Sequence, residues 1–96
     1  MKDIPNHLQK TYKLITSSFP QGIKQNEYEI LIYILYEHMS DRNLSDILSI
    51  ITNKDIIIVS NDIPQYCSDH NLNHDMTNEV MTKLNEHGFQ EWIKED

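Results

Sequence analysis

The chain has 96 residues, a net charge of −7, one cysteine, three prolines and two glycines. A chain of this length forms a single domain, residues 1–96, and has no room for a cofactor domain beside a substrate domain. Hydrophobic residues make up 39% and charged residues 24% of it, so burial of apolar surface can offset the entropy lost on folding. We therefore expect one folded domain.

The charges are unevenly distributed along the chain. Residues 1–25 contain four lysines and one aspartate, whereas residues 26–96 contain four basic and fourteen acidic residues. Proteins bind nucleic acid mainly through clustered lysine and arginine, which displace counterions from the phosphate backbone. The acidic balance therefore argues against a nucleic-acid partner and favours a basic or an uncharged one.

The sequence also predicts where the protein resides. A single cysteine excludes an internal disulfide framework, and residues 1–10 lack the apolar core of a signal peptide. The longest apolar run, residues 30–36, is far shorter than the roughly 20 residues of a membrane-spanning helix. We expect a cytoplasmic protein that does not enter the membrane.

The first predicted helix covers about residues 7–18. Pro5 can stand at an early helical position, and "FPQG" at residues 19–22 ends the helix, because a proline disfavours helical geometry in the residue before it. Four apolar residues recur at the three- and four-residue spacing of one helical face: Leu8, Tyr12, Ile15 and Phe19.

The second element is ambiguous between helix and strand. The run "ILIYILY" is rich in β-branched and aromatic residues, which also suit a buried strand. However, Asn26 is a good N-cap, Glu27 and Glu29 favour the first turn of a helix, and the segment 27–38 is longer than a usual strand. We predict a helix, and because it is apolar on nearly every side we expect it at the centre of the bundle.

The next two elements are also predicted to be helices. Ser40 is the expected N-cap of the third, whose apolar stripe contains Leu44, Ile47, Leu48 and Ile51. Asp55 is the expected N-cap of a short fourth helix that ends before Pro64, which the helical spacing of Ile56, Val59 and Ile63 favours. A short strand over residues 56–59 is the alternative for this fourth element.

The last predicted helix starts near Asp75 and places Met76, Val80 and Leu84 on one face. It ends at Gly88, which can adopt a left-handed conformation, with Phe89 folding back on Leu84. Trp92 is expected to close the end of the core. The predicted fold is therefore an all-α compact bundle of about five short helices.

Two blocks of the sequence resemble a known family. The segment "FPQGIKQNEYEILIYILYEHMSDRNL", residues 19–44, looks like the leading signature of small uncharacterised bacterial proteins grouped as domain of unknown function 3349. The matching positions are Phe19-Pro20, Gly22-Ile23, Glu27-Tyr28, Leu31, Leu35, Met39-Ser40-Asp41 and Leu44. A second block is similar to the closing pattern of that family: Asp55-Ile56, Val80, Lys83-Leu84 and Gly88-Phe89.

The resemblance implies a small all-helical domain and brings no catalytic residues with it. This chain departs from the pattern at Lys24, where such proteins more often have proline, and over residues 64–75, where it is longer.

One short segment is rich in potential metal ligands. Cys67, His70 and His74, with Asp69 or Asp75, contain the ligand types that zinc prefers. Structural zinc sites usually add a second distant ligand pair, which this sequence lacks. The turn-forming residues around the three also fit a solvated loop, and the acidic surroundings oppose a reactive Cys67 thiolate. We interpret the segment as a loop and keep a metal- or ligand-binding site as the alternative.

The eight aromatic residues exceed what one face of each helix must bury. We expect Phe19 and Tyr28 in the core, and we predict that Tyr33, Tyr36 and Trp92 contribute to a protein-binding surface or a homodimer face. The sequence contains neither an acid–base pair nor a glycine-rich phosphate loop. It therefore predicts a protein–protein interaction module without catalytic activity or cofactor, the alternative being metal or ligand binding through Cys67, His70 and His74.

Overall fold

The computed structural model describes residues 4–68 and 73–94, which form helices and contain no strand. This confirms the predicted all-α fold. A short 3-10 helix and six α-helices follow in chain order: η1 (Asn6–Leu8), α1 (Gln9–Ser18), α2 (Gln25–Leu35), α3 (Asp41–Thr52), α4 (Ile56–Tyr66), α5 (His74–Glu86) and α6 (Phe89–Lys94). The six-residue α6 was not predicted, because the chain resumes a helix directly after Gly88.

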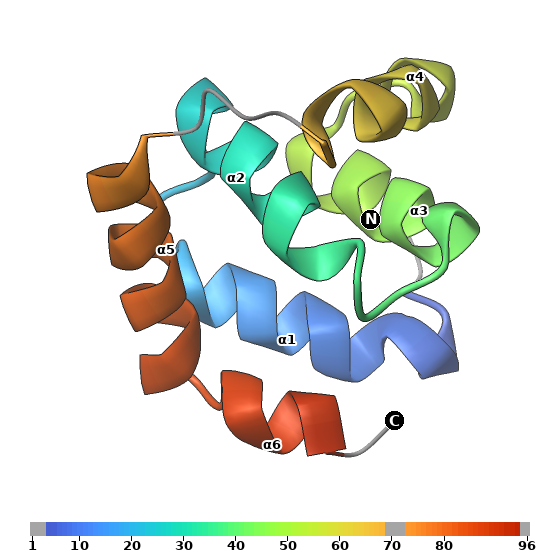
Figure 1. The fold of residues 1–96 in the computed structure, drawn as a ribbon. Helices are drawn as coiled ribbons and strands as arrows, with labels where there is room; N and C mark the ends of the chain where they lie inside the picture. Colours follow the sequence, from blue (N-terminus) through green and yellow to red (C-terminus); the bar gives the residue numbers. More distant parts are fainter. Residues whose placement is uncertain (1–3, 69–72, 95–96) are drawn as a thin grey trace.

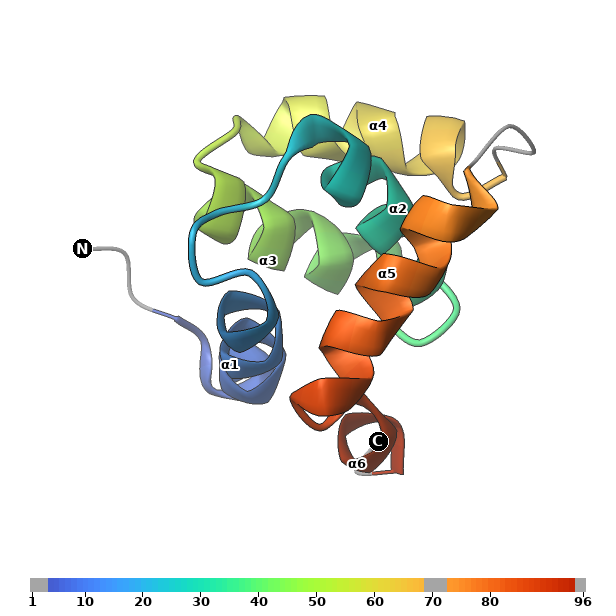
Figure 2. The same cartoon turned by 90° about the vertical axis from the view of Figure 1, so that its left-hand side faces the viewer.

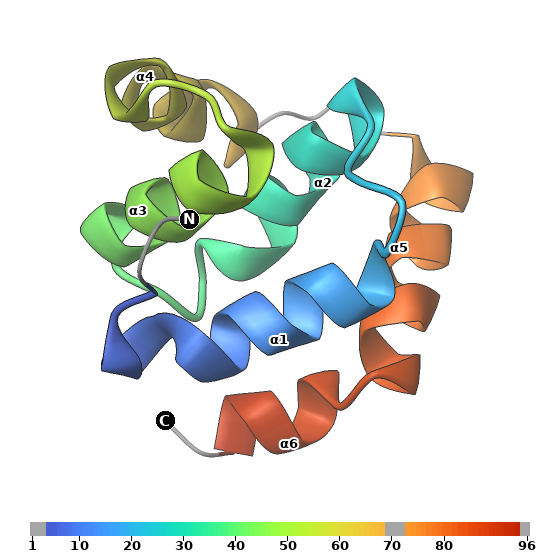
Figure 3. The ribbon, with the colours of Figure 1, turned by 180° about the vertical axis from the view of Figure 1, so that it is seen from behind.

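The helices enclose one core. α1 lies beside α6 and against α3, and α5 crosses both α1 and α2 (Figures 1 and 3). α4 packs mainly on α3 and also on α2, so it lies at the outside of the bundle (Figure 2). None of the helices in the described part of the chain is both long and apolar enough to cross a membrane.

α2 provides the largest buried surface. Seven of its eleven residues are buried, which agrees with the prediction of a central helix and confirms the helical alternative for "ILIYILY". The expected core residues Phe19 and Tyr28 are 6% and 1% exposed. The buried apolar residues are Leu8, Leu14, Ile15, Phe19, Tyr28, Ile30, Leu31, Ile32, Ile34, Leu35, Leu44, Ile47, Leu48, Val59, Ile63, Val80, Leu84 and Phe89.

The start of α2 differs from the prediction. The N-cap is Lys24 rather than Asn26. Glu27 reaches back so that its carboxylate accepts a hydrogen bond from the Lys24 backbone N–H at 2.9 Å, which satisfies one donor at the helix start. The acidic residue three positions into the helix therefore sets the boundary, and Asn26 lies inside the first turn.

The turn between α3 and α4 follows from local chemistry. The Ser40 hydroxyl accepts from the Asn43 N–H at 3.2 Å, which confirms the predicted cap of α3. At the other end Asn53 adopts a left-handed conformation with φ of 61°, which asparagine tolerates better than most residues. The Ser49 hydroxyl then donates to the Lys54 carbonyl at 2.7 Å. These contacts return the chain so that α4 packs on α3.

The prediction for α4 is correct in type and cap but wrong in where the helix ends. Asp55 caps the helix by accepting from the Ile57 N–H at 2.8 Å, and Val59 and Ile63 are buried. However, Ile56 is 44% exposed, because α4 is covered from one side only. The helix also continues through Pro64 to Tyr66.

Packing explains why Pro64 does not end α4. A proline inside a helix removes one backbone hydrogen bond and clashes with the preceding turn. The helical pattern of backbone hydrogen bonds nevertheless continues after Pro64, where the Cys67 N–H donates to the Ile63 carbonyl at 3.0 Å. Ile63 is 2% exposed, and the Tyr66 ring meets the Tyr28 ring edge-on at 6.5 Å. Burial of side chains on both sides of Pro64 holds the last turn in place.

The C-terminal helices agree with the prediction at their caps. The Asn73 side chain accepts from the backbone N–H groups of Asp75 and Met76, so α5 begins one residue before the predicted start. Gly88 has φ of 100°, as expected for a residue that ends a helix. Trp92 packs on the core edge, and its indole N–H donates to the hydroxyl of Thr11 on α1 at 2.9 Å.

One buried tyrosine joins α2 to the α3–α4 unit. The Tyr28 hydroxyl donates to the Asp62 carboxylate on α4 at 2.7 Å, and the Lys54 ammonium lies 4.2 Å from the centre of its ring. Burial raises the pKa of Tyr28, and the bond to Asp62 raises it further, so the hydroxyl keeps its proton. Tyr28 therefore combines core packing with a charge-assisted hydrogen bond.

We expect Tyr28→Phe to lower the free energy of unfolding by about 1.5 kcal/mol, because it removes a hydrogen bond to a carboxylate. Tyr33→Phe is the matched control on the same helix, since Tyr33 is 40% exposed, and it should change stability by less than about 0.5 kcal/mol. Urea denaturation measures both. Equal losses in the two variants would contradict a special role for Tyr28.

Candidate functional site

Three of the four exposed large hydrophobic residues among the described residues lie on α4. Ile56, Ile57 and Ile58 are 44%, 67% and 52% exposed, and we call these three residues the isoleucine face. Successive residues of a helix point about 100° apart, so three in a row cannot all turn toward a core that contacts one side. The neighbouring Val59 is fully buried, which anchors the helix and leaves the isoleucine face outward.

The sequence-based prediction used Ile56 only as one of three apolar residues at helical spacing and did not single out the isoleucine face. The sequence did contain a sign of this exposure. Three consecutive isoleucines extend over more of the helix circumference than the apolar stripe of an ordinary amphipathic helix. The sequence could not decide which of the three is exposed, since that depends on which side of α4 meets α3 and α2.

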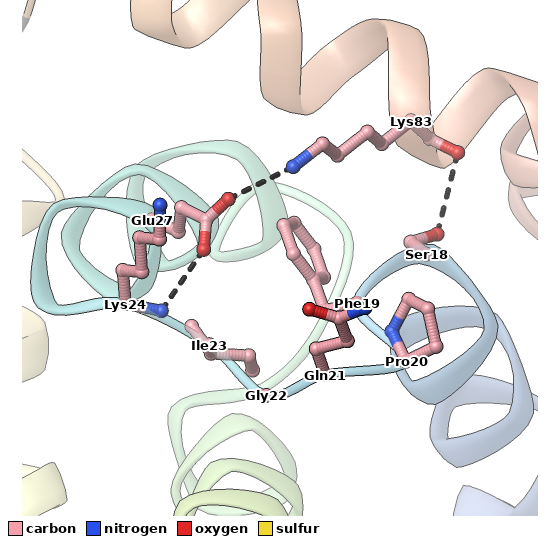
Figure 4. Close-up of a pocket in the computed structure, with 9 residues that line it drawn as sticks. All are labelled: Ser18, Phe19, Pro20, Gln21, Gly22, Ile23, Lys24, Glu27 and Lys83. Carbon is pink, nitrogen blue, oxygen red and sulfur yellow. Dashed lines mark hydrogen bonds and ion pairs between the residues drawn. The ribbon is translucent and has the colours of Figure 1, made fainter.

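A second candidate is a pocket of about 430 Å³ beside the loop between α1 and α2 (Figure 4). We call it the loop pocket. Its walls come from the end of α1, the connecting loop, the first turn of α2 and one lysine of α5. The lining residues are Ser18, Phe19, Pro20, Gln21, Gly22, Ile23, Lys24, Glu27 and Lys83. Six of them carry the family resemblance noted above: Phe19, Pro20, Gly22, Ile23, Glu27 and Lys83.

An ion pair crosses the loop pocket. The Lys83 ammonium lies 3.0 Å from the Glu27 carboxylate and 5.1 Å from the centre of the Phe19 ring. The Lys83 carbonyl also accepts from the Ser18 hydroxyl at 3.3 Å. Figure 4 shows the Glu27 carboxylate between the Lys24 backbone N–H and the Lys83 ammonium. The pocket wall thus connects α1, α2 and α5.

The ionisation of Glu27 follows from these contacts. Burial by itself raises the pKa of the carboxyl, since Glu27 is only 7% exposed. The hydrogen bond from the Lys24 backbone together with the hydrogen bond and charge of Lys83 outweighs this effect, so the pKa is lower than its ordinary value of 4.5. Glu27 is therefore charged at neutral pH.

The predicted aromatic surface is divided in the structure. The rings of Tyr33 and Tyr36 are 6.4 Å apart, and Tyr33 is 40% exposed. Among the described residues, Trp92 makes its ring contacts with Phe89, stacked at 5.8 Å, and with His38 at 6.1 Å. Trp92 thus joins α6 to the bundle, whereas Tyr33 and Tyr36 pair with each other at the C-terminal end of α2.

The predicted metal segment is only partly within the described residues. His70 and Asp69 lie outside them. Cys67 is half-buried at the end of α4, where its thiol donates to the Pro64 carbonyl at 3.7 Å. His74 is exposed and begins α5. Among the residues that the structure describes, no three His, Cys, Asp or Glu side chains are grouped to hold a metal ion. The site formed by Cys67, His70 and His74 stays a prediction.

A comparison of the chain with protein-family models, with curated proteins and with solved structures finds no match.

We expect Glu27→Gln to lower the free energy of unfolding by about 1 kcal/mol at pH 7. Because folding lowers the pKa of Glu27, its contribution is complete above the ordinary value of 4.5 and disappears as the pH falls through the lowered pKa. The stability difference between wild type and variant should therefore narrow below pH 4.5. Urea denaturation at a series of pH values measures it.

Glu79→Gln, the same change at an exposed position of α5, is the matched control and should show neither effect. A constant difference between Glu27→Gln and wild type down to pH 3 would show that the ion pair is not the cause.

Proposed function

We propose that this protein is a small cytoplasmic interaction module without catalytic activity, and that its partner docks on the isoleucine face. The observation that carries the proposal is the exposure of three successive isoleucines on a helix at the outside of the bundle: Ile57 points away from the core, and Ile56 and Ile58 flank it on either side of the helix. Contiguous exposed apolar side chains commonly mark an interaction surface, whereas scattered ones do not.

The proposed surface is preferred over the one formed by Tyr33, Tyr36 and Trp92. Ile57 is more exposed than Tyr33, at 67% against 40%. Trp92 already donates its indole N–H to Thr11 and stacks on Phe89. Tyr33 and Tyr36 remain a second candidate surface, which the experiment below distinguishes from the isoleucine face.

The chemistry of the surroundings indicates the kind of partner. The α3–α4 unit carries four aspartates and two basic residues: Asp41, Asp46, Asp55 and Asp62 against Arg42 and Lys54. Two of these residues are engaged with α2. The Lys54 ammonium lies over the Tyr28 ring and donates to the Gln25 side chain at 3.2 Å. The Asp62 carboxylate accepts from the Tyr28 hydroxyl. The remaining three aspartates against Arg42 leave the balance acidic. The surface therefore suits an apolar segment flanked by basic residues, because opposite charges around an apolar contact favour association.

A helix is the partner that fits this shape. An outward helical face packs well against the ridges of another helix, and an amphipathic helix supplies apolar side chains on one side. Three isoleucines cover much less than the roughly 800 Å² per partner of a stable interface, and two copies of a −7 chain repel each other. We therefore propose a transient complex with a basic amphipathic helix rather than a stable homodimer.

The family membership suggested by the two sequence blocks is part of the same proposal. It adds no activity.

A lysine- and leucine-containing amphipathic peptide tests the docking proposal. In ¹⁵N-labelled protein, the peptide should shift the amide signals of residues 55–61, whereas a scrambled peptide of the same composition should not, because it lacks an apolar stripe. Ile57→Ser should weaken binding at least tenfold and change stability by less than about 0.5 kcal/mol, since the side chain is exposed.

Tyr33→Ser is the matched control and should leave binding unchanged. Weaker binding in Tyr33→Ser but not in Ile57→Ser would move the docking surface to the tyrosine pair. If the scrambled peptide binds as tightly as the amphipathic peptide, the binding depends on net charge and not on an apolar stripe. Analytical ultracentrifugation of the protein alone tests for a homodimer. If the wild type sediments as a dimer and Ile57→Ser as a monomer, the isoleucine face binds a second copy of the chain rather than a different partner.

A further inference from the structure

We propose that the loop pocket binds a small organic anion that has an apolar body, such as an arylacetate or a branched-chain carboxylate. The proposal is independent of docking on α4, because no residue of α4 lines this pocket. Its volume of about 430 Å³ lies within the usual range for small-molecule sites, which is roughly 300–1,000 Å³.

The pocket offers hydrogen-bond donors that the protein itself does not use. A lysine ammonium has three N–H donors. Lys83 uses one on Glu27, and its side chain remains 45% exposed. The exposed Lys24 ammonium makes no hydrogen bond or ion pair with the residues that the structure describes, although its charge helps to lower the pKa of Glu27. Lys83 therefore has donors to spare at the pocket, and Lys24, which also lines it, adds a second positive charge beside Glu27.

The charge of the pocket favours an anion over a cation. Two lysines and one glutamate line it, so the local balance is positive although the whole chain is acidic. The Glu27 carboxylate is buried and already accepts from both the Lys24 backbone and Lys83. A cationic ligand would have to displace Lys83 from Glu27, whereas a carboxylate can accept from the unused donors without breaking that ion pair.

Part of the wall is apolar, although Ser18 and Gln21 also line the pocket. Phe19, Pro20 and Ile23 border the hollow below the ion pair (Figure 4), and Gly22 leaves the loop open, since a Cβ built there would meet no atom within 4 Å. An apolar body on these side chains and a carboxylate at the lysines would use both parts of the pocket. This combination separates the proposed ligand from inorganic anions, which would use the lysines only.

The three probes phenylacetate, phenylacetamide and phenethylammonium share one ring and differ in charge. Titrated separately into ¹⁵N-labelled protein, phenylacetate should shift the amide signals of Gly22, Ile23 and Lys24 and saturate at a concentration at least fivefold below that needed by the other two. Acetate should bind more weakly than phenylacetate, because it lacks the apolar body. Absence of shifts with phenylacetate, or equal binding of the amide or the amine, would overturn the proposal.

Lys24→Gln should weaken phenylacetate binding at least threefold. It leaves the Glu27–Lys83 ion pair intact, so the variant should remain folded and weaker binding can be attributed to the lost charge. Lys13→Gln removes the same charge from an exposed position of α1 outside this pocket and should bind as wild type does. Equal weakening in both variants would show that net charge, rather than the loop pocket, governs binding.

Discussion

The enclosure of α2 is the constraint on which the rest of the structure depends. This helix is apolar over most of its circumference, so it is stable only when other helices cover it on several sides. α5 and α4 contact it directly, and each is joined to it by a polar contact as well. Glu27 binds Lys83 of α5, and Tyr28 binds Asp62 of α4. The two residues are adjacent in sequence and direct α2 to its two neighbours.

This arrangement also produces the two candidate sites. Because α4 is needed on one side of α2 and α3, its opposite side has no helix to cover it, and the isoleucine face is exposed there. Glu27 pairs with Lys83 of α5 above the loop between α1 and α2. No side chain of the described residues fills the space between this ion pair and the loop, and that space is the loop pocket. Both candidates are therefore consequences of how α2 is enclosed.

The two sites have different chemistry and suit different ligands. The isoleucine face is apolar, convex and set among aspartates, which suits a basic helix. The loop pocket is concave, carries two lysines and has an apolar floor, which suits a small anion. The fold creates this contrast, since it brings Lys24 of the basic first quarter of the sequence together with Lys83 of the acidic remainder.

Local signals in the sequence specify the helices and most of their ends, because caps and helical periodicity act within a few residues. Ser40, Asp55 and Gly88 were each predicted in their observed roles, and the apolar stripes of α1, α3 and α5 point inward. Where a boundary depended on distant packing the prediction failed: α4 passes through Pro64 because Ile63 and Tyr66 are held by the core. Local signals did not reveal that Ile56, Ile57 and Ile58 stay exposed on α4. Nor did they reveal that Lys83 contacts Glu27, 56 residues earlier. These features depend on the relative placement of helices, which periodicity along one helix does not specify.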